Sequence, residues 1–246
     1  MKKLHMVQVD GGYFLMGLQV ESVEQALELY HGMLHTVKVP DFLISRNLVS
    51  QQSYAIVMGN DPFGDRRDDD APMTGISWSD AIRFCNGLSR VEGRETAYAI
   101  DGDEVSCNWN AKGYRLPTEA EWEFVARGGV FGKPRELFSD KFKEKLSGGE
   151  GPNDKHTENE VPKRNKLGVR DMIGSVWQWC WDWYGENYYE HAPVDHPKGP
   201  DTGAFRVIRG CVRSNGLNNG GLGQRQYAKP GTVSSEIGFR VVLCAC

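Results

Sequence analysis

The chain has 246 residues, 25% of them are charged, and the formal net charge is −4 at pH 7. This balance gives no electrostatic reason to expect a nucleic acid or an anionic membrane as partner. The hydrophobic fraction of 39% supports a sizeable core, and no apolar run approaches the roughly 20 residues of a membrane-spanning helix. We therefore expect a single domain over residues 1–246 with no membrane span.

Short apolar runs come first in the chain. Residues 7–16 predict a strand that crosses two adjacent glycines, and residues 42–45 predict a second strand. Between them, residues 21–30 have the spacing of a helix. The polar residues 61–72 predict an exposed loop.

Two helices have clear starting signals. Residues 77–80 read Ser-Trp-Ser-Asp and resemble a capping box, after which apolar residues recur at helical spacing as far as Leu88. Residues 118–121 read Thr-Glu-Ala-Glu and predict a second capped helix, which the glycines at 128–129 should end. A hairpin is expected near residues 101–103.

The second half of the chain is rich in turns. Residues 134–165 are charged and poor in apolar side chains, which predicts a long surface excursion, and strands are expected at 207–208 and 238–243. Four tryptophans alternate from Trp177 to Trp183, so in a strand they would share one face, and we expect them to pack in the core. Because helices precede most of the strands, the pattern favours an α+β fold with short antiparallel strands and an irregular core.

Four segments, taken together, point to a family. They read Thr-Gly-Ile-Ser-Trp at 74–78, Gly-Tyr-Arg-Leu-Pro-Thr-Glu-Ala-Glu-Trp-Glu at 113–123, Asp-Met-Ile-Gly-Ser-Val-Trp-Gln-Trp at 171–179, and Val-Ile-Arg-Gly at 207–210 with Ile-Gly-Phe-Arg at 237–240. In this order they resemble the formylglycine-generating enzymes, also called sulfatase-modifying factors, over nearly the whole chain. The resemblance implies a C-type-lectin-like fold with additional helices.

The chemistry of that family is missing from the matching positions. Members that oxidise sulfatase cysteines use two cysteines, which the resemblance places at Asn215 and Gly220 of this chain. Neither residue can bind copper as a thiolate or carry out redox chemistry. Cys211 is the one thiol nearby and stands where glycine is usual. The resemblance therefore implies that this chain is not an enzyme.

No cofactor is required by this interpretation, but a structural calcium ion is implied by the resemblance. The ligands that carry over are all oxygen donors, as calcium prefers: the side chains of Asp171 and Gln178 and the carbonyls of Gly174 and Val176. Gln178 replaces the usual Glu and removes one negative charge, so a metal-free turn is an equal alternative. A related branch holds iron with three histidines, but the histidines at 156, 191 and 196 lack a spacing that would bring them together.

The polar residues 211–236 resemble the diversified region of variable proteins encoded with retroelements. Such systems mutate adenines in asparagine codons, which gives Ser, Gly, Arg, Tyr, Leu, Ala, Thr or Cys but not Gln, Lys or Glu. The residues within this reachable set are predicted to form a variable, ligand-binding surface: Arg213, Ser214, Asn215, Gly216, Leu217, Asn218, Asn219, Gly220, Gly221, Tyr227, Ala228, Gly231, Thr232, Ser234 and Ser235. Six residues are interpreted as fixed scaffold, four because they lie outside the reachable set and two because they match the family pattern: Gln224, Gln226, Lys229 and Glu236, and Arg225 and Pro230.

Three functions follow as hypotheses. The favoured one is a non-catalytic protein that presents this surface to a protein or other macromolecular ligand. The alternatives are a degenerate or altered oxidase of the formylglycine-generating type and a scaffold paralogue without a ligand. Display would need the cell surface and hence a leader before this sequence, since residues 1–6 have a basic pair but no apolar region behind it. A cytoplasmic location is the alternative.

Overall fold

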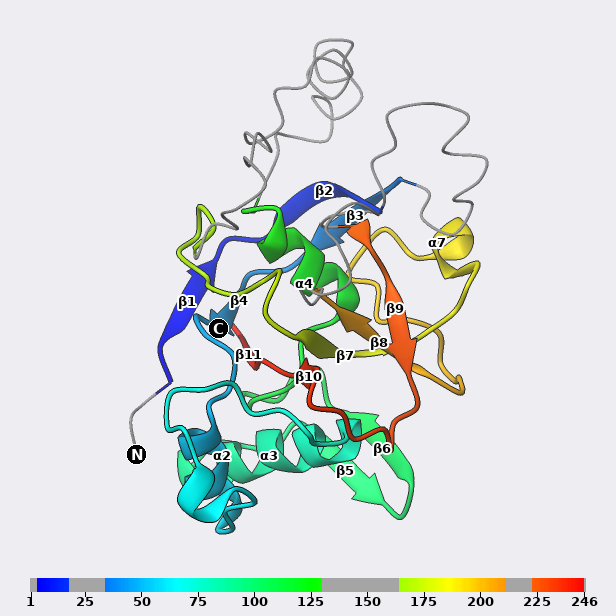
Figure 1. Ribbon diagram of the computed structural model, residues 1–246. Helices are drawn as coiled ribbons and strands as arrows, with labels where there is room; N and C mark the ends of the chain where they lie inside the picture. The colour runs from blue at the N-terminus through cyan, green and yellow to red at the C-terminus, as the bar shows by residue number, and fades with distance from the viewer. Residues whose placement is uncertain (1–3, 18–33, 130–163, 211–222, 246) are drawn as a thin grey trace.

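The computed structural model describes residues 4–17, 34–129, 164–210 and 223–245, in which short strands and helices are mixed (Figure 1). The strand expected at residues 7–16 is divided into β1 (Met6–Val9) and β2 (Gly12–Met16). Between them, a Cβ added at Gly11 would lie 2.4 Å from backbone atoms of the chain opposite. Only glycine permits this close approach, so the break between the strands falls there.

A three-stranded antiparallel sheet joins segments from both ends of the chain. Its central strand is β4 (Phe42–Ser45), which the sequence predicted. β1 pairs with one edge of β4 and β11 (Val242–Cys244) with the other (Figure 1). Beside this sheet, β2 pairs antiparallel with β3 (His35–Val39), which the sequence analysis did not predict.

A four-stranded sheet has the order β10-β7-β8-β9, with β9 at its edge. Its strands are β7 (Trp177–Trp183), β8 (Arg206–Arg209), β9 (Gln226–Ala228) and β10 (Ile237–Gly238). β8 pairs antiparallel with β7 and β9, whereas β10 pairs parallel with β7. The predicted hairpin near 101–103 is formed by β5 (Tyr98–Asp101) and β6 (Glu104–Cys107).

Both predicted capping boxes are present. α3 (Trp78–Val91) begins after Ser77, and α4 (Glu119–Ala126) begins after Thr118; in each, the cap side chain and the third helical residue exchange hydrogen bonds with each other's backbone N–H. The other helical elements are α2 (Gln51–Met58), α7 (Tyr188–His191) and a 3₁₀ turn at Gly64–Arg66. In the described parts of the chain, every helix is too short or too polar to cross a membrane.

Two apolar clusters form the core. The larger surrounds α3 and includes Trp78, Trp177 and Trp179. Trp181 packs against it, and Trp183 stacks on Trp78 with ring centroids 6.4 Å apart, so the four alternating tryptophans pack on one side of β7 as predicted. The smaller cluster surrounds α4 and its Trp122.

Some expectations fall outside the described residues. These are the helical spacing at 21–30 and most of the excursion at 134–165. The expected loop at 61–72 is largely exposed but contains the 3₁₀ turn. Cys85 and Cys180 are both fully buried in the core.

Candidate binding surface

α4 carries three glutamates that are buried in the protein. Glu119, Glu121 and Glu123 are at most 1% exposed. A buried carboxylate without a partner carries a large desolvation cost. Arginines from several distant segments supply the partners, and these pairs fix the segments to one another.

Glu121 joins α4 to the segment that precedes it. Its carboxylate accepts hydrogen bonds from Arg115 Nη1 at 2.7 Å and Nη2 at 2.6 Å, and from the backbone N–H of Thr118 at 2.9 Å. Burial opposes ionisation, but Arg115 outweighs it and holds the pKa of Glu121 well below its ordinary value. This charged pair therefore stabilises the helix start at neutral pH.

Glu119 binds two arginines from different strands. Arg225, next to β9, donates from Nε to Oε1 at 2.8 Å and from Nη2 to Oε2 at 3.0 Å. Arg209, the last residue of β8, donates from Nη1 to Oε1 at 3.0 Å. We call these three side chains the Glu119 clamp; each is at most 6% exposed. Burial alone would raise the pKa of Glu119, but the two arginines outweigh it and lower that pKa.

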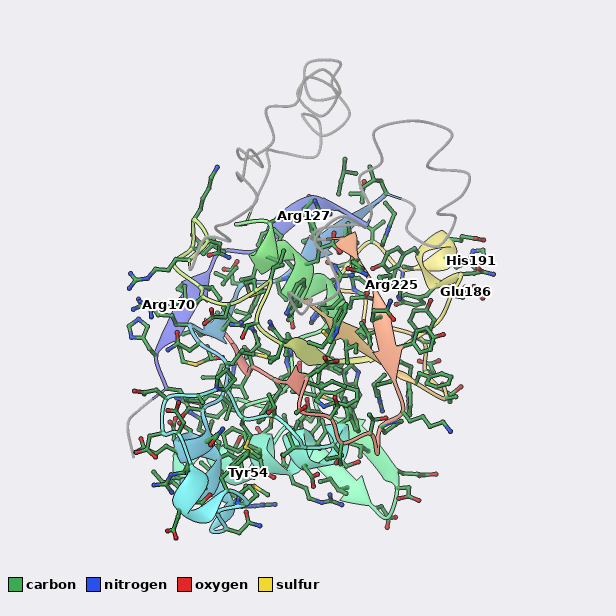
Figure 2. All side chains as sticks on the ribbon, viewed as in Figure 1. Tyr54, Arg127, Arg170, Glu186, His191 and Arg225 are labelled. Carbon is green, nitrogen blue, oxygen red and sulfur yellow. The ribbon has the colours of Figure 1, made fainter. Side chains whose placement is uncertain are left out.

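Further contacts hold the two arginines of the clamp in place. Arg209 donates to Glu123 at 2.5 Å, and its guanidinium lies 5.2 Å from the centre of the Trp122 ring. Arg225 donates to the carbonyl of residue 185 at 3.2 Å and lies 4.0 Å from the centre of the Tyr189 ring. Figure 2 shows Arg225 between β9 and α7. Both arginines are therefore fixed by several charged or aromatic neighbours.

The clamp brings together the ends of residues 210–224, the first part of the predicted variable stretch. Residues 210–224 lie between Arg209 and Arg225, yet the two guanidinium groups meet at one carboxylate. Nine of the predicted contact residues lie outside the described residues: Arg213, Ser214, Asn215, Gly216, Leu217, Asn218, Asn219, Gly220 and Gly221. Their placement on a binding surface stays a prediction.

An aromatic patch lies beside the clamp. We define it as Tyr184, Phe205 and Tyr227. The Tyr227 ring lies 4.3 Å from that of Tyr184 and 4.9 Å from that of Phe205, measured between centroids. Tyr227 is 46% exposed, and Arg225 lies 4.9 Å from the centre of the Tyr184 ring. One predicted contact residue thus presents a large aromatic surface to solvent, directly over the clamp.

The other described residues of the predicted surface divide into two kinds. Gly231 and Ser235 are exposed, and Thr232 and Ser234 are half-buried. A Cβ added at Gly231 would meet no heavy atom within 4 Å, so a side chain has room there. Ala228 differs from the rest because it packs against the larger apolar cluster.

The backbone of this stretch is fixed although its side chains are largely exposed. The carbonyl of Pro230 accepts a hydrogen bond from the N–H of Trp78 at 2.9 Å, and the carbonyl of Ser234 accepts one from residue 75 at 2.9 Å. The carbonyl of Glu236 accepts one from Trp177 at 2.8 Å. These contacts use main-chain atoms, so they do not depend on which side chain stands at the position.

Among the predicted calcium ligands, the Gln178 side chain is already hydrogen-bonded within the protein. Gln178 Oε1 accepts hydrogen bonds from Trp122 Nε1 at 2.8 Å and from Arg240 Nε at 2.7 Å, which occupies both lone pairs. Its amide nitrogen donates to the carbonyls of Asp171 and Met172. The Asp171 side chain instead lines a cleft on the molecular surface. As placed here, Gln178 does not fit a calcium ion, because protein donors already take its oxygen.

Three of the four described cysteines are not set up as nucleophiles. Burial raises the pKa values of the Cys85 and Cys180 thiols far above the ordinary range, and that of Cys107 to about 12. No group of three or more metal-binding side chains occurs within the described parts of the chain. Cys211 and the two positions matched to the family's catalytic cysteines, 215 and 220, lie outside the described residues.

Solved structures define the fold class. Treponema denticola variable protein 1 is similar with a TM-score of 0.71 and 26% identity, over 97% of this chain and 94% of that one. PvdO from Pseudomonas aeruginosa has the same fold, with a TM-score of 0.67 and 23% identity over 97% of this chain and 93% of that one. The fold is thus the C-type-lectin-like fold in its formylglycine-generating-enzyme form, as the sequence predicted.

The chain belongs to the family of the sulfatase-modifying factor enzyme 1-like domain, whose profile matches residues 2–245. The formylglycine-generating enzyme of Streptomyces coelicolor is 33% identical over 186 residues, which are 69% of this chain and 51% of that protein. The chaperone protein LppX of Paenibacillus barcinonensis is 28% identical over 239 residues, which are 84% of this chain and 81% of that protein. The chain therefore spans about half the length of the Streptomyces enzyme.

Proposed function

We propose that this chain is a non-catalytic ligand-binding protein that presents a diversified surface, within residues 211–236, to a protein or other macromolecular ligand. The Glu119 clamp is the observation that carries the proposal. It holds Arg209 and Arg225, one on each side of residues 210–224, through buried charged contacts. Neither arginine belongs to the predicted variable set. Side chains between them can therefore change without removing a contact of the clamp.

The described part of the surface supports the same function. Its backbone is tied to the core through the carbonyls of Pro230, Ser234 and Glu236, while its side chains are free to differ. Rigid aromatic side chains give large contact area at low conformational cost, and small polar residues adapt around them. Tyr227 in the aromatic patch is such an anchor, and Gly231 and Ser235 are exposed small residues of the same stretch.

The likeness to a protein named as variable adds support, because it extends over nearly the whole of both chains. Several curated relatives are formylglycine-generating enzymes, so an oxidase is the competing function. Asn215 and Gly220 at the matching positions disfavour it, since neither supplies a thiolate. Incubation with copper and a cysteine-containing sulfatase peptide should give no formylglycine product. Turnover in that assay would contradict the proposal.

Comparison of the gene between isolates tests the diversified surface. Differences should concentrate at the predicted variable residues and leave Glu119, Arg209 and Arg225 unchanged. A template repeat and a reverse-transcriptase gene should lie near the locus. Differences spread evenly along the chain, or the absence of both genetic elements, would contradict the proposal. Display also predicts a cell-surface location, which protease shaving of intact cells tests on the full-length protein.

A further inference from the structure

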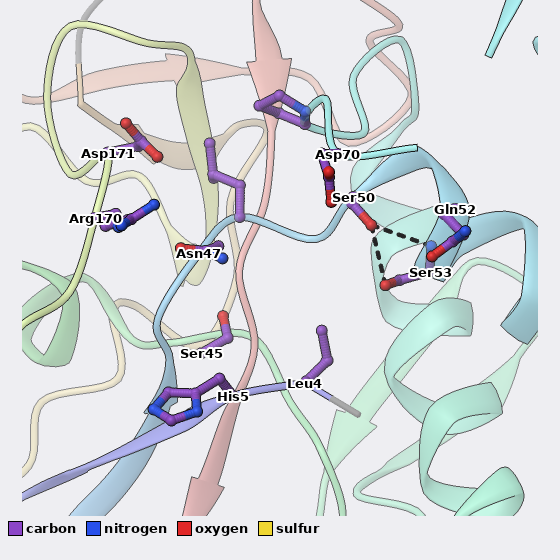
Figure 3. Close-up of a pocket in the computed structure, with 12 residues that line it drawn as sticks. Leu4, His5, Ser45, Asn47, Ser50, Gln52, Ser53, Asp70, Arg170 and Asp171 are labelled. Atoms are coloured by element: carbon purple, nitrogen blue, oxygen red, sulfur yellow. Dashed lines mark hydrogen bonds between the residues drawn. The ribbon is translucent and has the colours of Figure 1, made fainter. Parts of the chain in front are cut away.

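A polar cleft of about 460 Å³ opens away from the Glu119 clamp. Its walls come from the start of β1, the connection from β4 to α2, the first turn of α2 and residues 170–171 (Figure 3). β1 and α2 lie on one side of the molecule and β9 on the other (Figure 1). Its volume falls within the range of small-molecule sites, about 300–1,000 Å³. None of the predicted variable residues that the structure describes lines this cleft.

Several polar groups of the cleft have no partner of their own. The side chains of Asn47, Arg170 and Asp171 make no hydrogen bond or ion pair within the described residues, although all three line the cleft. Arg170 Nε is shielded from solvent and still has no acceptor. Shielded polar atoms are nearly always paired in native proteins, so an unpaired guanidinium nitrogen beside a cavity calls for an external acceptor.

The charges restrict the chemistry of that acceptor. Arg170 needs an anionic or strongly accepting group. Asp171, the next residue, and Asp70 across the cleft carry negative charge that repels a simple anion. A simple cation would pair with a carboxylate but face the guanidinium. A neutral polyol would leave Arg170 without a counter-charge.

We infer that this cleft binds a small zwitterion of the free α-amino acid class, with its carboxylate on Arg170 and its ammonium on Asp171. Such a ligand gives Arg170 an acceptor and the Asp171 carboxylate a donor at once. Asn47, which also lines the cleft, remains to receive a polar side chain. This site lies apart from the proposed variable surface and does not depend on it.

Calorimetry and thermal shift with L-serine and L-glutamine test the inference. Both amino acids should bind at millimolar concentration and raise Tm, whereas acetate, ethylammonium and glucose, which carry one charge or none, should not. Arg170→Gln and Asp171→Asn should each weaken binding by about tenfold or more, as expected for loss of a charged hydrogen bond. Asp171 has φ 54°, a conformation that asparagine also adopts, so this variant keeps the backbone.

Arg83→Gln is the matched control, because Arg83 is an exposed arginine on α3 that does not line the cleft. It should bind both amino acids as the native chain does. The inference is overturned if neither amino acid binds, if acetate or ethylammonium acts as strongly as the amino acids, or if both cleft variants bind like the native chain. Substitutions at Tyr227 and Gly231 should leave amino-acid binding unchanged, which separates this test from that of the variable surface.

Discussion

Replacing Glu119 with glutamine tests the Glu119 clamp. The change keeps the size of the side chain but removes the charge shared by Arg209 and Arg225 at 2.8–3.0 Å. Loss of one partner from a buried ion pair costs about 3–5 kcal/mol, because the other charge is left uncompensated. Arg209 still pairs with Glu123, so we expect a loss near the lower end, about 3 kcal/mol in the free energy of unfolding. Urea unfolding followed by tryptophan fluorescence measures it.

The pH dependence and a control variant sharpen this experiment. The pKa of Glu119 is lowered in the folded protein, so its stabilisation is present above the ordinary value of 4.5 and is lost as the pH falls through the folded pKa. The difference between native chain and variant should therefore shrink in acid. Asp195→Asn removes the exposed pair of Lys38 and Asp195 at 3.2 Å, and should have no measurable effect because solvent screens it. An unchanged urea midpoint for Glu119→Gln would refute the reasoning.

Three further outcomes are expected. Gly231→Asn should change the free energy of unfolding by less than about 0.5 kcal/mol. Gly113→Ala should lower it by more than about 2 kcal/mol, because the added Cβ would lie 1.9 Å from a backbone oxygen. Equal urea midpoints for the two variants would contradict this. Calcium in place of EDTA should leave Tm unchanged, because Gln178 Oε1 already accepts two hydrogen bonds, and a rise of several degrees would show that calcium displaces them. Iodoacetamide should label Cys85 and Cys180 only after unfolding, since both are buried with raised pKa values, and mass spectrometry of the folded protein would expose rapid labelling.

Most of the predicted helices and strands were predicted from residues that lie close together in the sequence. The boxes at Ser77 and Thr118 involve residues three apart, so they are legible in sequence and both helices begin where predicted. α2 was missed because its cap, Ser50, has no acidic residue in the first turn and no long apolar face follows. β3 was missed although Val37 and Val39 alternate with polar residues, which is the ordinary pattern of a half-buried strand.

The contacts of the Glu119 clamp could not be predicted from the spacing of residues in the sequence. Glu119 and Arg225 are 106 positions apart, and Glu119 and Arg209 are 90 apart, so no local spacing pairs them. Both Glu119 and Arg209 lie in segments that carry the family resemblance, which was the available signal. Gln178 was interpreted as a calcium ligand with a metal-free turn as the alternative, and no local signal pointed to Trp122 and Arg240, which donate to its amide oxygen.

The position of the clamp also bears on how long the segment between Arg209 and Arg225 can be. The entropy lost in holding together the ends of a chain segment grows only with the logarithm of its length, about 0.6 kcal/mol for each doubling. The contacts that hold these ends are charged, buried and made by residues outside the segment. Inserted residues would therefore cost little compared with what the clamp supplies. Insertions between Arg209 and Arg225 would therefore change how far the surface extends, just as substitutions change its chemistry.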